Sequence, residues 1–369
     1  MSLGFYVFPD LYLGRGILAV ALVSALPGLL LLRTGFGYLV RHRALRSRVL
    51  VLGTGKAAAA LARFRRQTDH FGMDFVGYVP VSGEERLVDP RQILDREESL
   101  CGMADGQVDE IVVAVDERRG VLPMEDLLEC RIRGVEVTDI LTFLERETGK
   151  IKLDLVSPGW LTYAPGFSYR GVLRRAAKRT MDVAVSLVFL VFAAPVMAVT
   201  AAAILLEPPF GGPVLYRQTR VGEGGRTFSL IKFRSMRVDA EKEGDVRWAE
   251  SEDPRVTRVG TVLRKYRLDE LPQLFNILRG EMSFVGPRPE RPELDEDLLR
   301  QLPYYSDRYR VKPGLTGWAQ ISYPYGASVA DAFEKLEYDL YYVKNFSFFL
   351  DLMILLQTTE VVVWGKGAR

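Results

Sequence analysis

Two long apolar stretches interrupt a chain that is otherwise rich in charge. The longer one, Val183 to Leu206, contains no charged residue and carries Pro195 near its middle. As a straight helix of about 24 residues it would extend about 36 Å, enough to cross a hydrocarbon core of about 30 Å. Basic residues flank it on both sides: Arg174, Arg175, Lys178 and Arg179 before it, and Arg217 and Arg220 after it.

These flanks and the internal proline favour a re-entrant helix over a crossing. Basic residues prefer the cytoplasmic side of a membrane, so both ends of the stretch belong there. A proline inside a helix removes one hydrogen bond and bends or breaks the helix. The pattern therefore predicts a Pro-broken hairpin over residues 183–206 that enters and leaves the membrane by the same face. A buried helix in a soluble core is the alternative.

The first apolar stretch, Gly16 to Leu32, contains Pro27 and is marginal in length for a span. A basic run follows it: Arg33, Arg41, His42, Arg43, Arg46 and Arg48. We expect residues 1–47 to form a membrane anchor and a basic linker on the cytoplasmic side. A cleaved signal peptide is the alternative. However, the charges follow the apolar stretch, and no small-residue cleavage site stands out.

Between these stretches the pattern changes to short apolar runs separated by helical segments. The runs are Arg48–Gly53, Phe75–Val79, Asp109–Val115 and Gly134–Asp139. Strands that alternate with helices indicate a parallel, doubly wound sheet. The sequence therefore predicts an α/β fold with a Rossmann-like domain over residues 48–150.

The turn after the first of these strands resembles a dinucleotide-binding fingerprint. Gly53 and Gly55 open it, and Ala58 stands where a third glycine often lies. No acidic residue closes the second strand to hold a ribose hydroxyl; Val79 and Pro80 are there instead. A scaffolding or regulatory role is favoured for this domain, with nucleotide binding as the alternative.

Composition narrows the chemistry. The 369 residues suggest more than one domain, and a net charge of only +2 argues against a nucleic-acid-binding protein. His42 and His70 are the only histidines, so neither a histidine-based triad nor a histidine-rich zinc site is expected. Cys101 and Cys130 lack metal-ligand spacing, which favours a reducing, cytosolic location for the soluble parts. Carboxylates must carry any nucleophilic or acid–base chemistry.

The run from Arg264 to Pro272 combines two adjacent carboxylates with several cations. Apolar residues recur here at helical spacing: Leu268, Leu271, Phe275 and Leu278. Because proline is tolerated only in a first turn, we expect a helix to begin near Asp269. Asp269 and Glu270 would then lie where free amides favour negative groups. Helix capping alone would explain the carboxylates but not the cations. Adjacent carboxylates among cations suit phosphoryl transfer, with one as the nucleophile and the other as a Mg²⁺ ligand.

Further cations lie in turns rich in glycine and proline. Arginine forks and backbone amides suit a pyrophosphate, and the prolines around Arg288 give its guanidinium a stiff mount. The candidate substrate-binding residues are Arg217, Arg220, Lys232, Arg234, Arg267, Arg288, Arg310 and Lys312. Each turn alone could be a surface loop, but together they indicate one anionic site.

The triplet Asp295-Glu296-Asp297 has the D-x-D spacing that metal-dependent glycosyltransferases use. It follows Pro292 in a strongly acidic segment. We interpret it as a solvated, capped start of a helix and not as a metal site.

Taken together, these motifs resemble the bacterial sugar transferase family of monotopic phosphoglycosyl transferases. The resemblance begins at about Lys178 and predicts a mainly helical catalytic domain over residues 178–369, after a linker at 151–177. The upstream sheet domain is similar to that of the larger branch linked with exopolysaccharide export. The matching motifs are Lys178-Arg179-x-x-Asp182, Gln218–Gly225, Lys232–Met236, Leu268–Gln273, Gly286–Pro289 and Lys312–Gly317.

The resemblance implies a reaction. Asp269 would attack the sugar-bearing phosphorus of a nucleotide diphosphate sugar, usually a UDP-sugar, and expel UMP. The phosphosugar would then pass to undecaprenyl phosphate at the cytoplasmic face of the bacterial inner membrane. Glu270 would help to hold Mg²⁺, and Arg288 would contact the nucleotide. The resemblance further implies a homodimer.

The resemblance also implies roles outside the carboxylate pair. Lys178 and Asp182, one helical turn apart, would fix the helix break at Pro195. The stretch from Phe346 to Trp364 reads as an amphipathic helix that lies against the membrane or another subunit.

Two other classes of protein are weighed against this one. A nucleotide-sugar oxidoreductase or dehydratase built on the sheet domain would need a Tyr-x-x-x-Lys pair, and the run Tyr341–Lys344 has the wrong spacing. A non-catalytic membrane scaffold for polysaccharide assembly predicts nothing special about Asp269 and leaves the arginine-rich turns unexplained.

Overall fold

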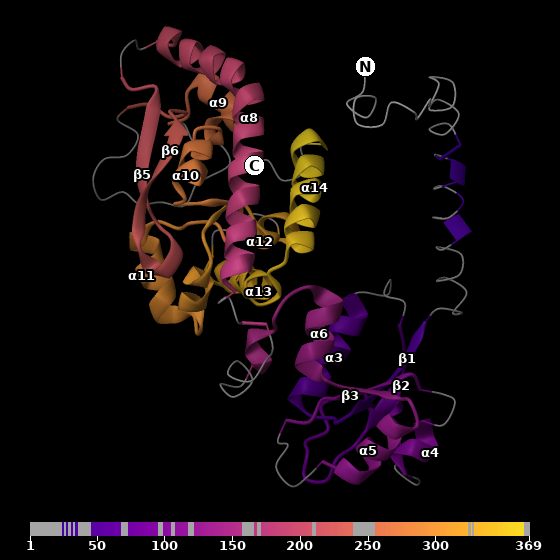
Figure 1. Cartoon of the computed structure of the whole chain (residues 1–369). Coiled ribbons are helices and arrows are strands. Elements are labelled where there is room, and N and C mark those ends of the chain that lie inside the picture. The colour runs from indigo at the N-terminus through magenta and orange to yellow at the C-terminus, as the bar shows by residue number, and fades with distance from the viewer. Residues whose placement is uncertain are drawn as a thin grey trace. The chain divides into compact units, whose positions relative to one another are not determined.

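The chain folds into two compact units, Met1–Phe143 and Leu144–Arg369, in a computed structural model (Figure 1). The structure describes residues 24–25, 27–28, 31, 34–35, 46–67, 73–94, 99–104, 108–116, 122–156, 166–167, 171–208, 212–238, 255–323, 326 and 328–364. The predicted anchor at 16–32 lies largely outside these residues, and both histidines lie wholly outside them. Each unit is described by itself below.

The first unit contains the predicted parallel sheet. Its strands are β1 (Ser47–Leu52), β2 (Met73–Val79), β3 (Glu110–Val113) and β4 (Glu136–Asp139). Their order is β2-β1-β3-β4, and all neighbours pair in parallel. The four short apolar runs of the sequence are thus confirmed as strands. The chain runs outward from β1 to β2, then crosses to the other side of β1 to form β3 and β4, as in doubly wound sheets.

Short helices connect these strands: α3 (Lys56–Gln67), η1 (Pro90–Gln92), α4 (Leu100–Ala104) and α5 (Met124–Ile132). Helix α6 (Ile140–Thr148) follows the last strand, and the boundary between the two units falls within it. Apolar side chains of the strands, with Leu50 and Ile111 at the centre, form the core of the unit. Cys101 of α4 and Cys130 of α5 are buried in this core and form a disulfide, with Cα atoms 5.1 Å apart. This pair departs from the reducing location predicted from the cysteines. The sequence did not predict it, because 29 positions separate the two cysteines and only the packing of α4 on α5 brings them together.

The long apolar stretch of the second unit forms a single helix, α8 (Val172–Leu206), with Pro195 inside it. At about 1.5 Å per residue, 35 residues would extend about 52 Å if straight. Figure 1 shows the helix bent into two arms. The bend at the proline was predicted, and the helix continues through it as a single element. The re-entrant course through a membrane stays a prediction.

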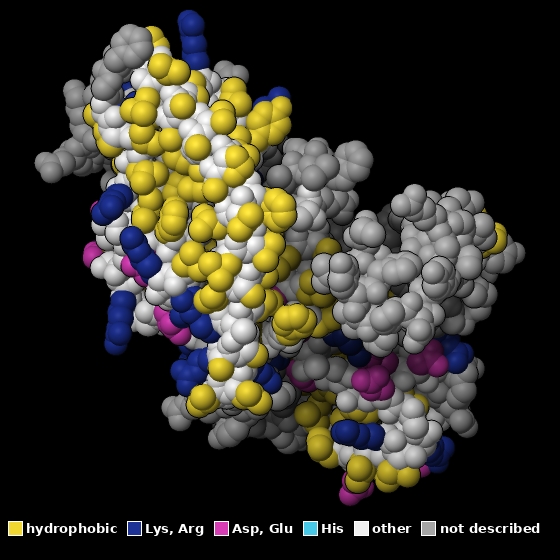
Figure 2. All heavy atoms as spheres, turned by 45° about the horizontal axis from the view of Figure 1, so that its top comes forward, with side chains coloured by type: hydrophobic (Ala, Val, Ile, Leu, Met, Phe, Trp, Pro, Cys, Tyr) yellow, Lys and Arg dark blue, Asp and Glu magenta, His cyan; other side chains and the backbone are white. Residues whose placement is uncertain are grey.

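The side chains of α8 are largely exposed. Val191, Phe192 and Val199 have exposed fractions of 71%, 74% and 71%. The helix is long and apolar enough to cross a membrane. Figure 2 shows hydrophobic side chains gathered over one face of this unit, with lysine and arginine at its margins. Water-soluble proteins rarely expose apolar patches of this kind. The alternative of a buried helix in a soluble core is therefore wrong.

Two short sheets and several short helices surround α8. The hairpin β5 (Leu215–Val221) and β6 (Thr227–Phe233) is antiparallel, with η3 (Glu223–Gly225) at its turn. The strands β7 (Ser283–Val285) and β8 (Gly314–Thr316) pair in parallel. The helices are α9 (Arg258–Lys265), η4 (Leu268–Glu270), α10 (Gln273–Arg279), α11 (Pro292–Gln301), η5 (Tyr305–Arg310), α12 (Trp318–Ser322), α13 (Val329–Asn345) and α14 (Phe348–Trp364).

The C-terminal helix α14 packs beside α8. Leu350 and Ile354 are buried in the cluster that also holds Ala193 of α8. Large apolar side chains are also exposed on α14, namely Phe348, Phe349, Leu352 and Leu356, together with Gln357 and Thr359. The helix predicted at 346–364 is confirmed, but its expected amphipathic character is not found among the side chains that the structure describes. Both faces of α14 carry apolar side chains.

The segment after α6 is held by α13. Glu337 is completely buried and accepts hydrogen bonds from Lys152 Nζ at 3.0 Å and the Leu153 amide at 3.1 Å. Lys150 Nζ is also 3.0 Å from this carboxylate. Residues at the start of the predicted linker 151–177, including η2 (Leu153–Leu155), are thus integrated into the second unit.

Candidate active site

The predicted carboxylate pair lies in a tight turn between α9 and α10. Arg267 has a φ of 53°, a left-handed conformation that non-glycine residues rarely adopt. The 3₁₀ turn that follows, Leu268 to Glu270, carries both carboxylates. Pro272 then caps α10, which begins at Gln273. The expected helix start at Asp269 is therefore four residues too early. Backbone strain of this kind tends to occur at functional sites, where surrounding packing maintains it.

Asn276 of α10 fixes the turn to the hairpin. Its side-chain oxygen accepts from the Ile231 amide at 3.0 Å, and its side-chain nitrogen donates to the Ser229 carbonyl at 2.7 Å. Leu274 and Ile277 are buried next to it. The Asn276 side chain thus bonds to both a backbone amide and a backbone carbonyl of β6, which fixes the position of α10 against this strand. The carboxylates just before α10 therefore keep a constant position relative to β6.

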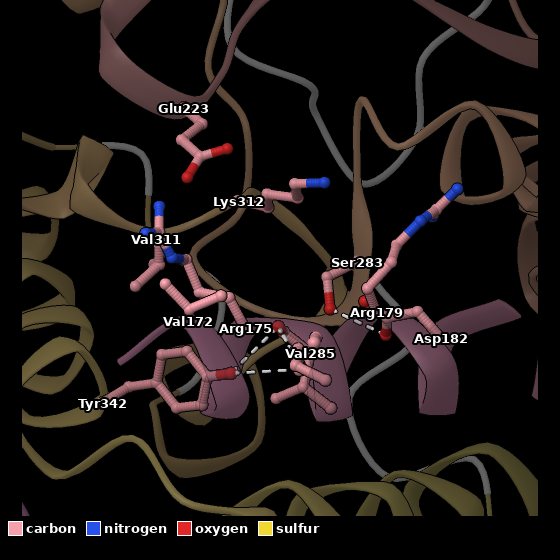
Figure 3. Close-up of a pocket in the computed structure, with 12 residues that line it drawn as sticks. Val172, Arg175, Arg179, Asp182, Glu223, Ser283, Val285, Val311, Lys312 and Tyr342 are labelled. Atoms are coloured by element: carbon pink, nitrogen blue, oxygen red, sulfur yellow. Dashed lines mark hydrogen bonds between the residues drawn. The ribbon is translucent and has the colours of Figure 1, made fainter. Parts of the chain in front are cut away.

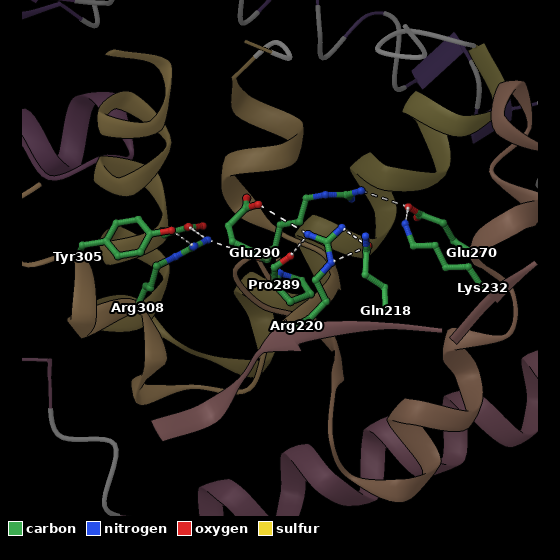
Figure 4. Close-up of polar contacts among 10 residues, drawn as sticks. Gln218, Arg220, Lys232, Glu270, Pro289, Glu290, Tyr305 and Arg308 are labelled. Atoms are coloured by element: carbon green, nitrogen blue, oxygen red, sulfur yellow. Dashed lines mark hydrogen bonds and ion pairs between the residues drawn. The ribbon is translucent and has the colours of Figure 1, made fainter. Parts of the chain in front are cut away.

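Glu270 lies between two cations (Figure 4). Its Oε1 is 3.5 Å from Lys232 Nζ and 3.3 Å from Arg288 Nη2. Burial alone would raise the pKa of Glu270, but the charges of Lys232, Arg288 and Arg267 outweigh it and lower this pKa to about 2. Glu270 is therefore ionised at every physiological pH. Burial in turn lowers the pKa of Lys232, against the opposing effect of Glu270.

Asp269 has a different environment. Its side chain is buried, yet no described residue forms a hydrogen bond or ion pair with its carboxylate. Burial and the adjacent Glu270 charge raise the pKa of Asp269, while Lys232, Arg264 and Arg288 oppose the shift. Two neighbouring carboxylates with pKa values displaced in opposite directions are typical of a site that assigns them different roles. Of the two carboxylates, Asp269 is therefore the one that no described side chain binds.

Arg288 is held by a close backbone crossing. A Cβ atom on Gly286 would lie 2.2 Å from the Lys312 carbonyl oxygen, so only glycine fits there. The Gly286 amide donates to the Thr316 carbonyl at 2.9 Å, and the Gly314 amide donates to the Pro287 carbonyl at 2.9 Å. The predicted stiff mount of Arg288 is thus made by β7, β8 and glycines as well as by the flanking prolines.

A buried ionic network supports Arg288 from behind. Arg308 Nη2 donates to the Arg288 carbonyl at 2.9 Å and to Asp339 Oδ2 at 2.8 Å (Figure 4). Arg308 Nη1 donates to the Tyr305 hydroxyl at 2.7 Å. Arg308 and Asp339 are both nearly inaccessible to solvent. Arg308 and Asp339 were not predicted as site residues. Arg308 lies in a run of cations with Arg310 and Lys312, and no sequence pattern around it indicates that its side chain turns inward.

The other predicted substrate-binding residues do not reach Glu270. Arg220 donates to Gln218 and to the Pro289 carbonyl at 3.1 Å, which ties the hairpin to the Arg288 turn. Arg234 donates to the Ile204 carbonyl near the end of α8 at 3.4 Å. The remaining three lie elsewhere: Arg217 is exposed on β5, Arg310 is exposed and paired with Asp307, and Lys312 lines a separate cavity. The cations around the carboxylates are thus Lys232, Arg267 and Arg288, with Arg264 acting on Asp269.

The acidic triplet in α11 has a split environment. Asp295 is buried and accepts a hydrogen bond from the Tyr309 hydroxyl, whereas Glu296 and Asp297 are exposed. The interpretation as a solvated helix start is therefore wrong for Asp295, because the fourth residue of the helix faces η5. No side chain caps α11, which starts with Pro292.

Lys178 and Asp182 anchor the first arm of α8. Lys178 Nζ donates to Asp351 Oδ2 at 2.6 Å, and Asp182 Oδ1 accepts from Ser283 Oγ at 2.9 Å and the Phe284 amide at 3.2 Å. These contacts join the helix to β7 and α14. Both residues precede Pro195 by more than three turns. They therefore fix the base of the helix and make no contact with the bend itself.

The carboxylate pair alone supplies too few ligands for Mg²⁺, so substrate phosphates and waters must supply the rest. Among the described residues, no group of three or more His, Cys, Asp or Glu side chains could hold a metal ion. Asp269 and Glu270 supply two carboxylates, and Glu270 is ionised. Mg²⁺ commonly binds through one or two carboxylates, several waters and substrate phosphates. The residues present therefore fit Mg²⁺ that arrives with a diphosphate.

In the first unit, the glycine turn that resembles a dinucleotide site is filled by the unit's own carboxylates. Asp116 accepts from the amides of Lys56 and Ala57 at 2.8 and 2.9 Å, at the start of α3. Glu84 accepts from the Thr54 amide at 2.7 Å and from the Asp116 amide at 3.0 Å. These amides are the ones that hold phosphate in dinucleotide-binding proteins. The arrangement supports a non-nucleotide role for this unit.

Comparison with known proteins identifies the second unit. The sequence model of the family described as bacterial sugar transferase matches residues 173–365, which include α8 from its second residue, the carboxylate turn and α14. The chain belongs to the bacterial sugar transferase family. The match covers the turn that carries Asp269 and Glu270 and the mounts of Lys232 and Arg288, so these features belong to the sugar transferase part of the chain.

Curated relatives extend the match upstream. The chain is 31% identical over 368 residues to a UDP-glucose:undecaprenyl-phosphate glucose-1-phosphate transferase of Xanthomonas campestris, covering 94% of this chain and 73% of that protein. It is 41% identical over 246 residues to a UDP-N-acetylgalactosamine-undecaprenyl-phosphate N-acetylgalactosaminephosphotransferase of Aeromonas hydrophila, covering 66% of this chain and 56% of that protein. A UDP-glucose:undecaprenyl-phosphate glucose-1-phosphate transferase of Escherichia coli is 40% identical over 53% of this chain. The chain thus spans little more than half of the Aeromonas relative.

Proposed function

We propose that this bacterial sugar transferase moves a sugar-1-phosphate from a UDP-sugar to undecaprenyl phosphate through a covalent intermediate on Asp269. The observation that carries the proposal is the contrast within the carboxylate pair. Glu270 is held by two cations, whereas no described residue binds the buried Asp269 carboxylate. A nucleophile must be available in this way, while a charged neighbour organises the phosphates.

In the first step an oxygen of Asp269 attacks the phosphorus that bears the sugar. The bond between this phosphorus and the bridging oxygen breaks, and UMP leaves with that oxygen. Arg288 and Lys232 lie beside Glu270, where their charges stabilise the phosphoryl oxygens. The product of this step is a mixed anhydride between the Asp269 carboxyl and the sugar phosphate.

In the second step an oxygen of the lipid phosphate attacks the same phosphorus. The bond to Asp269 breaks, the carboxylate is restored, and the sugar is left on a diphosphate-linked lipid. Burial of Asp269 excludes the bulk water that would otherwise hydrolyse the anhydride. Asp269 therefore takes the sugar phosphate from the nucleotide sugar and gives it up to the lipid phosphate.

Mg²⁺ is proposed as the cofactor, held by Glu270 together with the substrate diphosphate. When bound, it would neutralise charge on the phosphates. Lys232 and Arg288, which pair with Glu270 in the structure, would then be released toward the phosphates. The expected homodimer stays a prediction.

The bent α8 helix and the exposed apolar side chains of α14 support insertion into a membrane. Both carry exposed apolar side chains, and the cationic base of α8 lies at Arg174, Arg175 and Lys178. We propose that α8 enters the inner membrane from the cytoplasm and bends back at Pro195 toward the same face. This places the carboxylate turn where a cytosolic nucleotide sugar and a lipid phosphate can both reach it.

The reaction is tested by the nucleotide that leaves. We expect the purified full chain, in nanodiscs with undecaprenyl phosphate, Mg²⁺ and a panel of UDP-sugars, to release UMP with at least one donor. Omission of Mg²⁺ should abolish the release. Release of UDP would mean that the sugar is transferred without its phosphate, and would contradict the proposal. Chromatography of the nucleotides distinguishes the two products.

The pH profile gives a second test. Activity requires ionised Asp269, so kcat/KM should fall as the pH falls through the raised pKa of Asp269. Arg264 opposes this elevation; Arg264→Gln should therefore raise the pKa further and move the acid limb of the profile to higher pH. Arg264→Lys keeps the charge and should leave the limb near its original place. Lys265→Gln, on the next residue, is the control. A limb that stays in place in Arg264→Gln would contradict the role of Asp269.

A further inference from the structure

A cavity of about 400 Å³ lies at the base of α8 (Figure 3). Arg175 and Arg179 reach it from the helix, Lys312 from the segment before β8, and Glu223 from the turn of the hairpin. Apolar side chains, among them Val172, complete its lining. Lys312 was predicted to bind substrate, but the structure places it here.

The cavity is separate from the carboxylate pair. Arg179 donates to the carbonyls of Ile277 and Leu278 at 2.5 and 2.6 Å, near the C-terminal end of α10. Asp269 and Glu270 precede the opposite end of that helix. Seven helical residues span about 10 Å. A phosphate in the cavity would therefore lie beyond the reach of Asp269.

The charges in the cavity favour a singly charged anion. Lys178 is neutralised by Asp351, and Arg179 is bound only to carbonyls. No described residue forms a hydrogen bond or ion pair with the side chain of Arg175 or of Lys312. Two carboxylates oppose these cations, Asp182 and Glu223. The three remaining cations thus exceed the carboxylates by one, which matches a phosphodiester better than a doubly charged phosphomonoester.

The cavity opens beside apolar surface that suits an acyl chain. Val172, which lines the cavity, and the adjacent Leu173 have exposed fractions of 74% and 84%. Exposed apolar side chains of α8 resume at Leu187, beyond the cationic segment, and extend past Pro195 to Leu206. Arginine and lysine at the start of an apolar helix are typical of contacts with lipid headgroups.

We propose that this cavity binds the phosphodiester headgroup of a membrane phospholipid, which holds the base of α8 at the bilayer surface. Arg175, Arg179 and Lys312 bind the phosphate, and the acyl chains lie along α8. Glu223, across the cavity, disfavours a second negative charge. The inference rests on the proposed insertion of α8 into the membrane and not on the proposed reaction. Its test therefore needs no enzymatic turnover.

The test is a ligand titration of the full chain in an uncharged detergent, followed by Tm. We expect dihexanoyl phosphatidylglycerol to raise Tm in a saturable way, whereas dihexanoylglycerol, which lacks the phosphate, should not. In Arg175→Gln/Lys312→Gln the half-saturating concentration should rise about tenfold or more, because charge-assisted bonds are lost. Arg174→Gln is the matched control. It removes one positive charge from α8, next to Arg175, but Arg174 does not line the cavity, so its titration should match the wild type.

Two further probes distinguish the possible sources of phosphate. An equal response to inorganic phosphate would make the cavity a free-phosphate site and overturn the proposal. A tighter response to farnesyl phosphate, lost in the double variant, would make it a site for the phosphomonoester acceptor and would also overturn it. A response to phosphatidylglycerol that is unchanged in the double variant would mean binding elsewhere. If UMP release fails while this titration succeeds, the reaction is wrong and the lipid site remains.

Discussion

Asp269→Asn should abolish UMP release, with a loss of turnover of about a thousandfold or more, the scale expected when a covalent nucleophile is removed. The replacement has the same shape but no nucleophilic oxygen of comparable charge. No described residue bonds to the Asp269 carboxylate, so the variant loses no observed contact and should fold as the wild type does. The measurement is UMP release under saturating donor and acceptor.

The intermediate provides the sharper readout. Without undecaprenyl phosphate, wild-type protein incubated with its UDP-sugar should gain the mass of one sugar phosphate, located by peptide mass spectrometry at Asp269. Asp269→Asn should gain none. Asp297→Asn, an exposed carboxylate in α11, is the control and should retain both turnover and the adduct. An adduct on Glu270, or full turnover by Asp269→Asn, would falsify the assignment of the nucleophile.

Arg308→Met should lower the free energy of unfolding by about 3–5 kcal/mol, because it leaves Asp339 buried without its partner. Burial already raises the pKa of Asp339, against the effect of Arg308. Loss of the cation raises this pKa further, and either protonation or an unpaired charge costs stability. The check is thermal unfolding of the purified chain, with Arg300→Met as a control that removes only an exposed pair with Glu296.

A double variant separates stability from positioning. Arg308→Met/Asp339→Leu removes both charges and should regain much of the lost stability, since apolar pairs often replace buried ion pairs without cost. The Arg288 carbonyl still loses its donor at 2.9 Å, so KM for the UDP-sugar should stay raised. Arg308→Lys should give a KM for the UDP-sugar between those of the wild type and the double variant. If KM returns to the wild-type value in the double variant, Arg308 is a structural residue and does not position Arg288.

Local patterns in the sequence were sufficient to predict much of the fold. The four strands of the first unit follow from short apolar runs between helices, and the bent helix follows from an uncharged stretch around Pro195. Asp269 and Glu270 were predicted from their chemistry and their neighbours. The error in the helix start arose because Pro272 was assumed to lie in a first turn, whereas it caps α10.

What the sequence could not predict depends on contacts between distant segments. Arg308 and Arg310 differ by two positions in one cationic run, yet one is buried against Asp339 and the other is exposed. Lys312 belongs to the same run but faces the cavity beside α8. Asp295 likewise turns inward toward Tyr309. No periodicity distinguishes these residues, because the packing of η5 and α11 decides which way each side chain points.

Carboxylates of the first unit occupy the amides of its own glycine turn. Asp116 and Glu84 already satisfy the amides of Thr54, Lys56 and Ala57. A nicotinamide or adenine cofactor could bind there only by displacing two anions that are part of the same chain. Any such cofactor would therefore compete with carboxylates of the unit itself for these three amides.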